Sequence, residues 1–262
     1  MFRVAAFMAA VAATFLSQSV AARPVVAIID SGIARTPELI PVLIAEYDVA
    51  ADDMPRAAFR PRYSHGTQIA TILHREAKGA VDIVSMRIDD PAGCPAGRNP
   101  PCQPATLPIV RAIRTAIALK VSAINISLAL KEDPAIERAI GEAAQAGVAV
   151  IMAAGNDGFD HPGNKRMALA GNPRTVLVGA LDSAGSPWRW TNKPEAGASL
   201  PYEYVWRLGV EVPSTNADGS PVKITGTSAA APFETARRAT RPAAAPVQTA
   251  AIRTELAAAG AP

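Results

Sequence analysis

Three side chains in this 262-residue sequence could together activate a hydroxyl group for attack on a carbonyl carbon: Asp30, His65 and Ser228. A serine hydroxyl needs a base to take its proton, and an imidazole held by a carboxylate can act as that base. The chain contains only three histidines. His74 lies near the far end of the helix that His65 begins, and His161 lies in a loop, so both have simple surface interpretations. His65 is the candidate base, and because the macrodipole at a helix start disfavours imidazolium, we expect a neutral ring.

Two further groups could stabilise the negative charge that such an attack creates on the carbonyl oxygen. Ser228 begins a predicted helix in the segment 226–232, whose small residues let backbone and substrate approach it, and its backbone N–H can hold the developing oxyanion. Asn156 follows a predicted strand and offers a side-chain amide donor. Taken singly, each residue also has a common structural role: Asp30 in a turn, Ser228 as a helix N-cap and Asn156 in a loop.

The elements that must position these residues alternate between strands and helices. An apolar stripe at helical spacing predicts a helix over residues 107–119. A second helix is predicted over residues 134–146, with Asp133 as an N-cap, Pro134 at its first position and Gly147 after its end. Continuous apolar runs predict buried strands. These strands cover residues 25–29, 81–86, 121–128, 148–153 and 175–178.

This alternation predicts an α/β fold with three layers, in which a mostly parallel sheet carries helices on both faces. We expect a single domain over residues 23–262, with a polar and alanine-rich tail from about residue 233 to residue 262. Catalytic groups in such folds gather outside the carboxyl ends of the strands. Asp30 and Asn156 both follow predicted strands, so we expect them at that edge of the sheet.

The segments around these positions resemble the subtilisin-like serine peptidases. The candidate residues follow the chain order Asp, His, Ser, which is the order in subtilisin. The matching blocks are Ile29-Asp30-Ser31-Gly32, His65-Gly66-Thr67, Asn125-Ile126-Ser127-Leu128, Ala154-Gly155-Asn156 and Gly226-Thr227-Ser228-Ala229-Ala230-Ala231-Pro232.

The resemblance implies the subtilisin-like fold and a serine endopeptidase that hydrolyses protein or peptide substrates through an acyl-enzyme, without a cofactor. It implies that Ser228 is the nucleophile, that His65 acts as general base and then as general acid, and that Asp30 holds the imidazole tautomer. The Asn156 side chain and the Ser228 backbone N–H would form the oxyanion hole.

The resemblance also implies a substrate-binding pocket. Segments corresponding to Ser127-Leu128-Ala129 and Ala153-Ala154-Gly155 wall the pocket for the residue before the cut bond, and the first segment pairs with the substrate backbone as an added strand. Ala129 stands where the family usually has glycine, which would narrow this pocket.

The first residues predict export. One positive charge at Arg3 precedes an apolar run over residues 4–16 and a small-residue exit, which is typical of a secretory signal peptide over residues 1–22 with cleavage after Ala21 or Ala22. The alternative is an uncleaved membrane anchor, but a spanning helix needs about 20 apolar residues. We therefore expect a secreted or periplasmic protein with no membrane attachment after cleavage.

Cys94 and Cys102 are the only cysteines, and they flank a proline-rich segment. In an oxidising compartment they predict a disulfide bond, whose closure of a loop of about nine residues would stabilise the fold by roughly 2.5 kcal/mol on the chain-entropy model. The alternative is two free thiols. We predict no metal site, because neither cysteine has a further ligand at zinc spacing and the acid pairs at 52–53 and 89–90 resemble solvated turns.

Two features depart from the family pattern. Secreted members usually carry a propeptide that assists folding, whereas the first predicted strand begins shortly after the expected cleavage site. The chain therefore either folds unaided or is helped by a separate inhibitor or chaperone chain.

The helix after Ser228 is normally apolar, but residues 233–242 contain a glutamate and three arginines. Because burial of unpaired charge is costly, we expect this helix to end early or to face solvent, which would weaken the support under Ser228. A further helix is expected over residues 247–258.

Composition and charge exclude some functions. A net charge of +3, without a basic block interleaved with aromatic residues, argues against a nucleic-acid partner. Two other functions remain as alternatives. One is a catalytically weak protein that keeps the groove and binds extended peptides, which the polar helix after Ser228 favours. The other is a nucleotide-binding α/β domain, although no glycine-rich phosphate loop follows a predicted strand.

Overall fold

The computed structural model describes residues 23–51, 56–97, 100–197 and 199–241. The predicted signal peptide, the acid pair at 52–53 and the helix expected over residues 247–258 lie outside these ranges.

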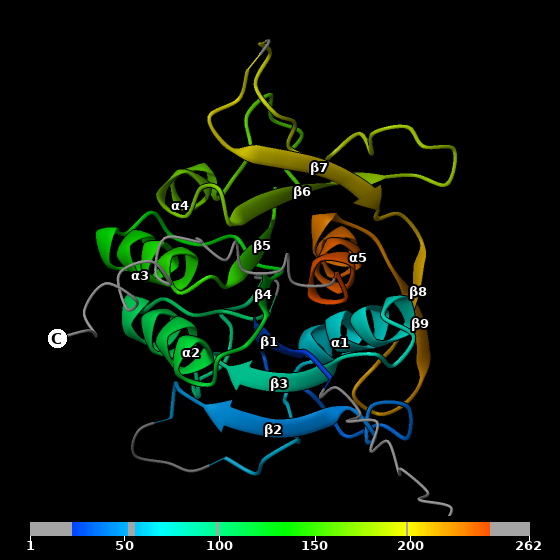
Figure 1. Cartoon of the computed structure of the whole chain (residues 1–262). Coiled ribbons are helices and arrows are strands. Elements are labelled where there is room, and N and C mark those ends of the chain that lie inside the picture. The colour runs from blue at the N-terminus through cyan, green and yellow to red at the C-terminus, as the bar shows by residue number, and fades with distance from the viewer. Residues whose placement is uncertain (1–22, 52–55, 98–99, 198, 242–262) are drawn as a thin grey trace, which may run out of the picture.

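A seven-stranded parallel sheet forms the centre of the molecule (Figure 1). Its strand order is β2-β3-β1-β4-β5-β6-β7. The five predicted strands correspond to β1, β3, β4, β5 and β6, whereas the two edge strands, β2 and β7, were not predicted. The bounds are β1 (Val25–Asp30), β2 (Leu43–Asp48), β3 (Asp82–Arg87), β4 (Ala123–Ile126), β5 (Ala149–Ala153), β6 (Thr175–Leu181) and β7 (Glu203–Leu208).

Helices cover both faces of this sheet, so the predicted three-layer α/β fold is confirmed. One face carries α2 (Thr106–Ala118), α3 (Pro134–Gln145) and α4 (Lys165–Ala170), and the other carries α1 (His65–Glu76) and α5 (Thr227–Ala239). A short antiparallel hairpin of β8 (Val212–Thr215) and β9 (Pro221–Ile224) packs beside α1. The Asp133 side chain accepts a hydrogen bond from the Ala135 backbone N–H at 2.8 Å, which confirms it as the N-cap of α3.

Alternate residues of β1 pack against the two helical layers. Ala27 and Ile29 belong to the cluster around α2 and α3, whereas Val26 and Ile28 belong to the cluster around α1 and α5. All four side chains are fully buried. This strand, which ends at Asp30, is therefore held by packing on both of its faces.

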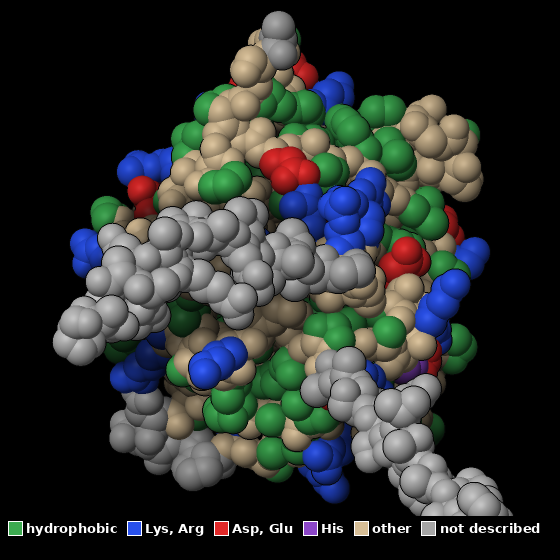
Figure 2. Space-filling view, in the orientation of Figure 1, with side chains coloured by type: hydrophobic (Ala, Val, Ile, Leu, Met, Phe, Trp, Pro, Cys, Tyr) green, Lys and Arg blue, Asp and Glu red, His purple; other side chains and the backbone are tan. Residues whose placement is uncertain are grey.

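The helix that follows Ser228 differs from the prediction. It continues to Ala239, and its inner face is buried, including Glu234, whose side chain has no exposed surface. The Glu234 carboxylate accepts hydrogen bonds from Arg237 at 2.8 Å and Arg238 at 2.6 Å, and it also binds Arg207 of β7. Ion pairing offsets the cost of burial. Figure 2 shows basic and acidic side chains gathered over the end of α5 and β7, where the arginines reach the surface.

Replacement of Glu234 by alanine is expected to lower the free energy of unfolding by about 3 kcal/mol, because three arginines lose their shared carboxylate. Burial raises the pKa of Glu234, but hydrogen bonds from Arg237 and Arg238 lower it from 4.5 to about 2 overall. Since the pKa is lower in the folded state, this stabilisation is complete above pH 4.5 and is lost as the pH falls towards 2. Urea unfolding at a series of pH values should show a steeper acid loss in wild type than in Glu234→Gln.

The control for this prediction is Glu132→Ala, since that side chain is 68% exposed and lies 3.6 Å from Arg166. We expect its effect to stay within about 0.5 kcal/mol. Equal losses in the Glu132 and Glu234 variants would contradict the stabilising role of the buried carboxylate.

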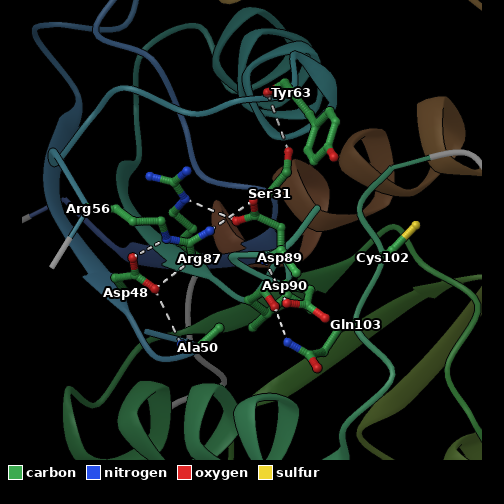
Figure 3. Close-up of polar contacts among 12 residues, drawn as sticks. Ser31, Asp48, Ala50, Arg56, Tyr63, Arg87, Asp89, Asp90, Cys102 and Gln103 are labelled. Carbon is green, nitrogen blue, oxygen red and sulfur yellow. Dashed lines mark hydrogen bonds and ion pairs between the residues drawn. The ribbon is translucent and has the colours of Figure 1, made fainter. Parts of the chain in front are cut away.

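The prediction of a solvated turn at Asp89 is wrong. Its side chain is 1% exposed, and it lies between Arg87, whose Nε donates at 3.0 Å, and Arg56, whose guanidinium lies 3.0 Å from the other carboxylate oxygen (Figure 3). Arg56 also binds Asp48 at the end of β2. Asp89 is therefore part of a buried ion-pair network with Arg56 and Arg87. Of the pair Asp89 and Asp90, only Asp90 is partly exposed.

Candidate active site

Asp30 and His65 meet at the carboxyl end of β1. His65 is the first residue of α1, and its Nδ1 lies 2.9 and 2.8 Å from the two oxygens of the Asp30 carboxylate. The Ser31 backbone N–H donates to the same carboxylate at 2.7 Å. The close approach of α1 to this turn requires Gly66, because a Cβ there would lie 2.3 Å from the carbonyl oxygen of Gly32. A carboxylate can only accept, so Nδ1 carries the hydrogen and Nε2 of the neutral ring is left as an acceptor.

The environment of His65 acts on its pKa in two directions. Burial lowers the pKa of His65, and the charge and hydrogen bond of Asp30 raise it, with a net rise above 6.5. From the sequence we expected the helix start to keep the ring neutral. In the structure the Asp30 carboxylate favours the protonated ring, and this effect outweighs burial. The ring keeps access to solvent, since its side chain is 21% exposed.

Ser228 is the second residue of α5 and lies at the same cleft as His65. Its Oγ donates a hydrogen bond to the carbonyl oxygen of Ser127 at 2.9 Å, and the Ser127 Oγ donates to the carbonyl oxygen of Ser228 at 3.0 Å. These reciprocal bonds join the end of β4 to the start of α5. In this structure the Ser228 hydroxyl therefore uses Ser127, and not His65, as its acceptor.

Asn156 is oriented by Thr227, which was not predicted as a site residue. The Asn156 Oδ1 accepts hydrogen bonds from the backbone N–H of Thr227 at 2.8 Å and from its hydroxyl at 2.9 Å. A backbone N–H can only donate, so the oxygen of the amide must face Thr227 and the NH₂ group must point away from it. Gly226, with φ 141°, permits this packing, because a Cβ there would lie 3.1 Å from the Asn156 Nδ2.

Buried polar groups support the start of α5 from below. The Asn125 side chain, which is fully buried on β4, donates to the Ser127 Oγ at 3.0 Å and accepts from the Thr235 hydroxyl at 2.8 Å. Thr235 lies two turns along α5 from Ser228. The prediction of a weakened support under Ser228 is therefore wrong. Hydrogen bonds join α5 to the β4 segment both at Ser228 and at Thr235.

A cleft with a cavity volume of about 1050 Å³ joins these groups. Its lining includes His65, Ser228 and Asn156, together with one of the two predicted wall segments, Ser127-Leu128-Ala129. The second predicted segment does not line this cavity: Ala153 and Ala154 are buried, and Gly155 is partly buried.

Asn164, which was not predicted as a site residue, connects the two predicted wall segments. Its side-chain NH₂ donates to the carbonyl oxygens of Leu128 at 2.8 Å and Ala153 at 3.0 Å, and its oxygen accepts from the Leu130 backbone N–H at 2.8 Å. Asn164 has φ 60°, a left-handed conformation that asparagine tolerates better than most residues. One buried amide therefore joins the two segments, in addition to the pairing of β4 with β5 that precedes them.

Residues 22–241 match the family model Peptidase_S8, which is described as the subtilase family. The chain belongs to the subtilase family. The resemblance inferred from the sequence is thus confirmed, and the family is one of serine peptidases. Subtilisin-like protease 10 of Trichophyton verrucosum (strain HKI 0517) is 33% identical over 113 residues, which make up 42% of this chain and 20% of the relative.

Solved structures of subtilases show the same fold. A cold-adapted subtilisin-like serine proteinase superposes with a TM-score of 0.63 at 24% identity, over 80% of this chain and 71% of that one. The patellamide maturation protease PatA superposes with a TM-score of 0.62 at 21% identity, over 82% of this chain and 76% of that one. At these identities the similarity concerns the fold, and the chemistry of this subtilase must be argued from its own residues.

Proposed function

We propose that this subtilase is an exported serine endopeptidase that hydrolyses protein or peptide substrates through an acyl-enzyme. The observation that carries the proposal is the hydrogen-bonded pair of Asp30 and His65 at the same cleft as the Ser228 hydroxyl and the oriented Asn156 amide. In this proposal, Asp30 holds the imidazole so that Nε2 faces the cleft as a base.

The first chemical step requires the Ser228 hydroxyl to exchange its acceptor. It leaves the carbonyl oxygen of Ser127 and donates to the Nε2 of His65, which takes the proton as Oγ attacks the substrate carbonyl carbon. A peptide that pairs with Ser127-Leu128-Ala129 as an added strand would compete for the same carbonyl oxygen and so release the hydroxyl. His65 then gives the proton to the leaving amine. In the second half of the reaction His65 takes a proton from water, which attacks the acyl-enzyme, and returns a proton to the Ser228 oxygen.

The negative charge of the tetrahedral intermediate would be held by two donors. One is the Ser228 backbone N–H at the start of α5, and the other is the Asn156 Nδ2, which the bonds to Thr227 leave free for this purpose. The second wall segment, Ala153-Ala154-Gly155, stays part of the proposed pocket for the residue before the cut bond, joined to Leu128 through the Asn164 side chain.

Replacement of Asn156 by alanine is expected to lower kcat about 10²- to 10³-fold with a small change in KM, because the lost donor acts mainly in the transition state. Steady-state kinetics on one peptide substrate measure both parameters. The control is Asn172→Ala, a loop asparagine whose side chain donates to the carbonyl oxygen of Pro201 away from the cleft. An Asn156 variant that changed only KM would argue against an oxyanion role.

The disulfide bond between Cys94 and Cys102 supports export, because such bonds persist in oxidising compartments. Among the helices that the structure describes, none combines the length and apolar character needed to cross a bilayer. Export through residues 1–22 to a periplasm or the medium is part of the proposal, and so is a separate chaperone or inhibitor chain as the alternative to unaided folding.

Incubation of the purified protein with a library of quenched fluorescent peptides, followed by mass spectrometry of the products, tests the proposal. We expect cleavage at internal peptide bonds. The alternative of a catalytically weak peptide-binding protein has lost the support it drew from the polar helix, since the inner face of α5 is buried and its charges are paired. Peptides that bind and remain intact would favour that alternative.

A further inference from the structure

A loop closed by the disulfide bond forms one wall of the cleft. We call residues 88–105 the disulfide loop; it connects β3 to α2, and positions 98 and 99 lie outside the description. Its members on the cleft are Asp90, Ala92, Gly93, Pro95 and residues 100–104. Ser127-Leu128-Ala129 lines the same cleft, so a peptide that pairs with this segment would also meet the disulfide loop.

Several bonds besides the disulfide hold this loop in place. The Cys94 backbone N–H donates to the Tyr63 hydroxyl at 2.8 Å, the Asp90 backbone N–H donates to the carbonyl oxygen of Cys102 at 2.9 Å, and the Gln103 side chain donates to the carbonyl oxygen of Ile88. Tyr63 itself lies two residues before His65. The described part of this wall is therefore held in place before substrate arrives, and contacts to it cost little conformational entropy.

Among the described residues that line the cleft, Asp90 is the only one with a carboxylate. Its Oδ1 accepts a hydrogen bond from the Ala92 backbone N–H at 2.9 Å, which fixes the side chain. Within the described part of the chain it has no ion pair, in contrast to its neighbour Asp89, which two arginines neutralise (Figure 3). Among the described residues, the cleft thus presents one fixed carboxylate without an ion-pair partner to a substrate.

We propose that Asp90 determines specificity by binding a lysine or arginine side chain of the substrate. This inference rests on the proposed peptidase function. The basic residue is not the one directly before the cut bond, because the pocket for that residue is assigned to Ser127-Leu128-Ala129 and Ala153-Ala154-Gly155. In a partly desolvated cleft, the attraction between a cationic side chain and this carboxylate is stronger than on an open surface.

Cleavage of paired peptides that differ only by lysine or norleucine at one position tests the proposal. In wild type, kcat/KM should be about 5- to 10-fold higher for lysine at the preferred position, and about 1 M salt should reduce this ratio. Asp90→Asn should abolish the preference and keep the turn, since an asparagine oxygen can accept from Ala92. Asp90→Lys should reverse the charge preference, so that a peptide with glutamate at this position is cleaved faster than one with lysine. The control is Asp182→Asn, which carries the same kind of turn bond, to Ala184 at 2.9 Å, away from the cleft.

Binding to the Ser228→Ala variant separates this inference from the proposed function. The lysine peptide should bind about 5- to 10-fold more tightly than the norleucine peptide by fluorescence anisotropy, and the difference should vanish in Ser228→Ala/Asp90→Asn. Wild type that hydrolyses no peptide would overturn the proposed function, while the binding ratio still tests Asp90. Equal binding and cleavage of both peptides, or a preference unchanged in Asp90→Asn, would overturn the role of Asp90.

Discussion

Replacement of Ser228 by alanine should reduce kcat about 10⁶-fold, the size of effect known for loss of the nucleophile in subtilisin. The reason is that no acyl-enzyme can form once Oγ is absent, and the remaining groups provide only binding and oxyanion stabilisation. The variant should fold normally, since the deleted hydroxyl forms a single hydrogen bond, to Ser127, at the cleft surface. Peptide affinity should persist. Stopped assays over long incubations with a fluorescent peptide measure the residual rate.

Two comparisons make this prediction specific. Ser183→Ala removes an exposed serine after β6 and should leave kcat unchanged. The double variant Ser228→Ala/His65→Ala should be about as slow as either single variant, because nucleophile and base act as one unit. Losses that multiplied in the double variant would show that His65 acts independently of Ser228.

Asp30→Asn should lower kcat about 10⁴-fold, an effect of the size known for loss of the carboxylate in serine peptidases. An asparagine amide can donate to the Nδ1 of His65 and so stabilise the wrong tautomer, in which Nε2 carries the hydrogen and cannot act as a base. The residual activity should also shift with pH. Wild-type kcat/KM should fall as the pH falls through the pKa of His65, which lies above 6.5. Without the charge of Asp30, burial still lowers the pKa of His65, so the midpoint should move to lower pH.

A pH series of kcat/KM for wild type and Asp30→Asn measures both effects. Asp48→Asn is the matched control, since Asp48 also ends a strand of the sheet but binds Arg56 away from the cleft. It should keep the wild-type midpoint. An unchanged midpoint in Asp30→Asn would mean that Asp30 does not set the protonation of His65.

The central strands could be predicted because they are buried on both faces. β1, β5 and β6 appear in the sequence as continuous apolar runs, which is typical of covered parallel strands. β2 and β7 lie at the sheet edges and are only partly buried, so polar residues such as Glu46 and Glu203 interrupt their pattern.

The burial of charged residues on α5 could not be predicted from the local sequence. Glu234, Arg237 and Arg238 suggested an exposed helix, whereas the network that allows burial is completed by Arg207 and Glu203 on β7. These partners lie 27 and 35 residues away in the chain. Local charge therefore gave the wrong expectation where a tertiary contact determined the outcome.

In the candidate site, too, some residues could be predicted from local sequence and others depend on tertiary contacts. Asp30, His65, Asn156 and Ser228 could be proposed because each lies at the end of a strand or the start of a helix, in blocks that resemble a known family. The residues that orient them could not. Thr227 is 71 residues from Asn156, and Thr235 is 110 residues from Asn125, so only the folded chain places these pairs together.

The central claim is that His65 activates the Ser228 hydroxyl, and covalent labelling with a fluorophosphonate tests it most directly. Intact mass and peptide mapping should place one adduct on Ser228 in wild type, with almost none in His65→Ala and full labelling in His161→Ala, whose histidine lies in an exposed loop. Circular dichroism should confirm that each variant is folded. Labelling of folded His65→Ala at the wild-type rate, or no labelling of folded wild type, would contradict the claim.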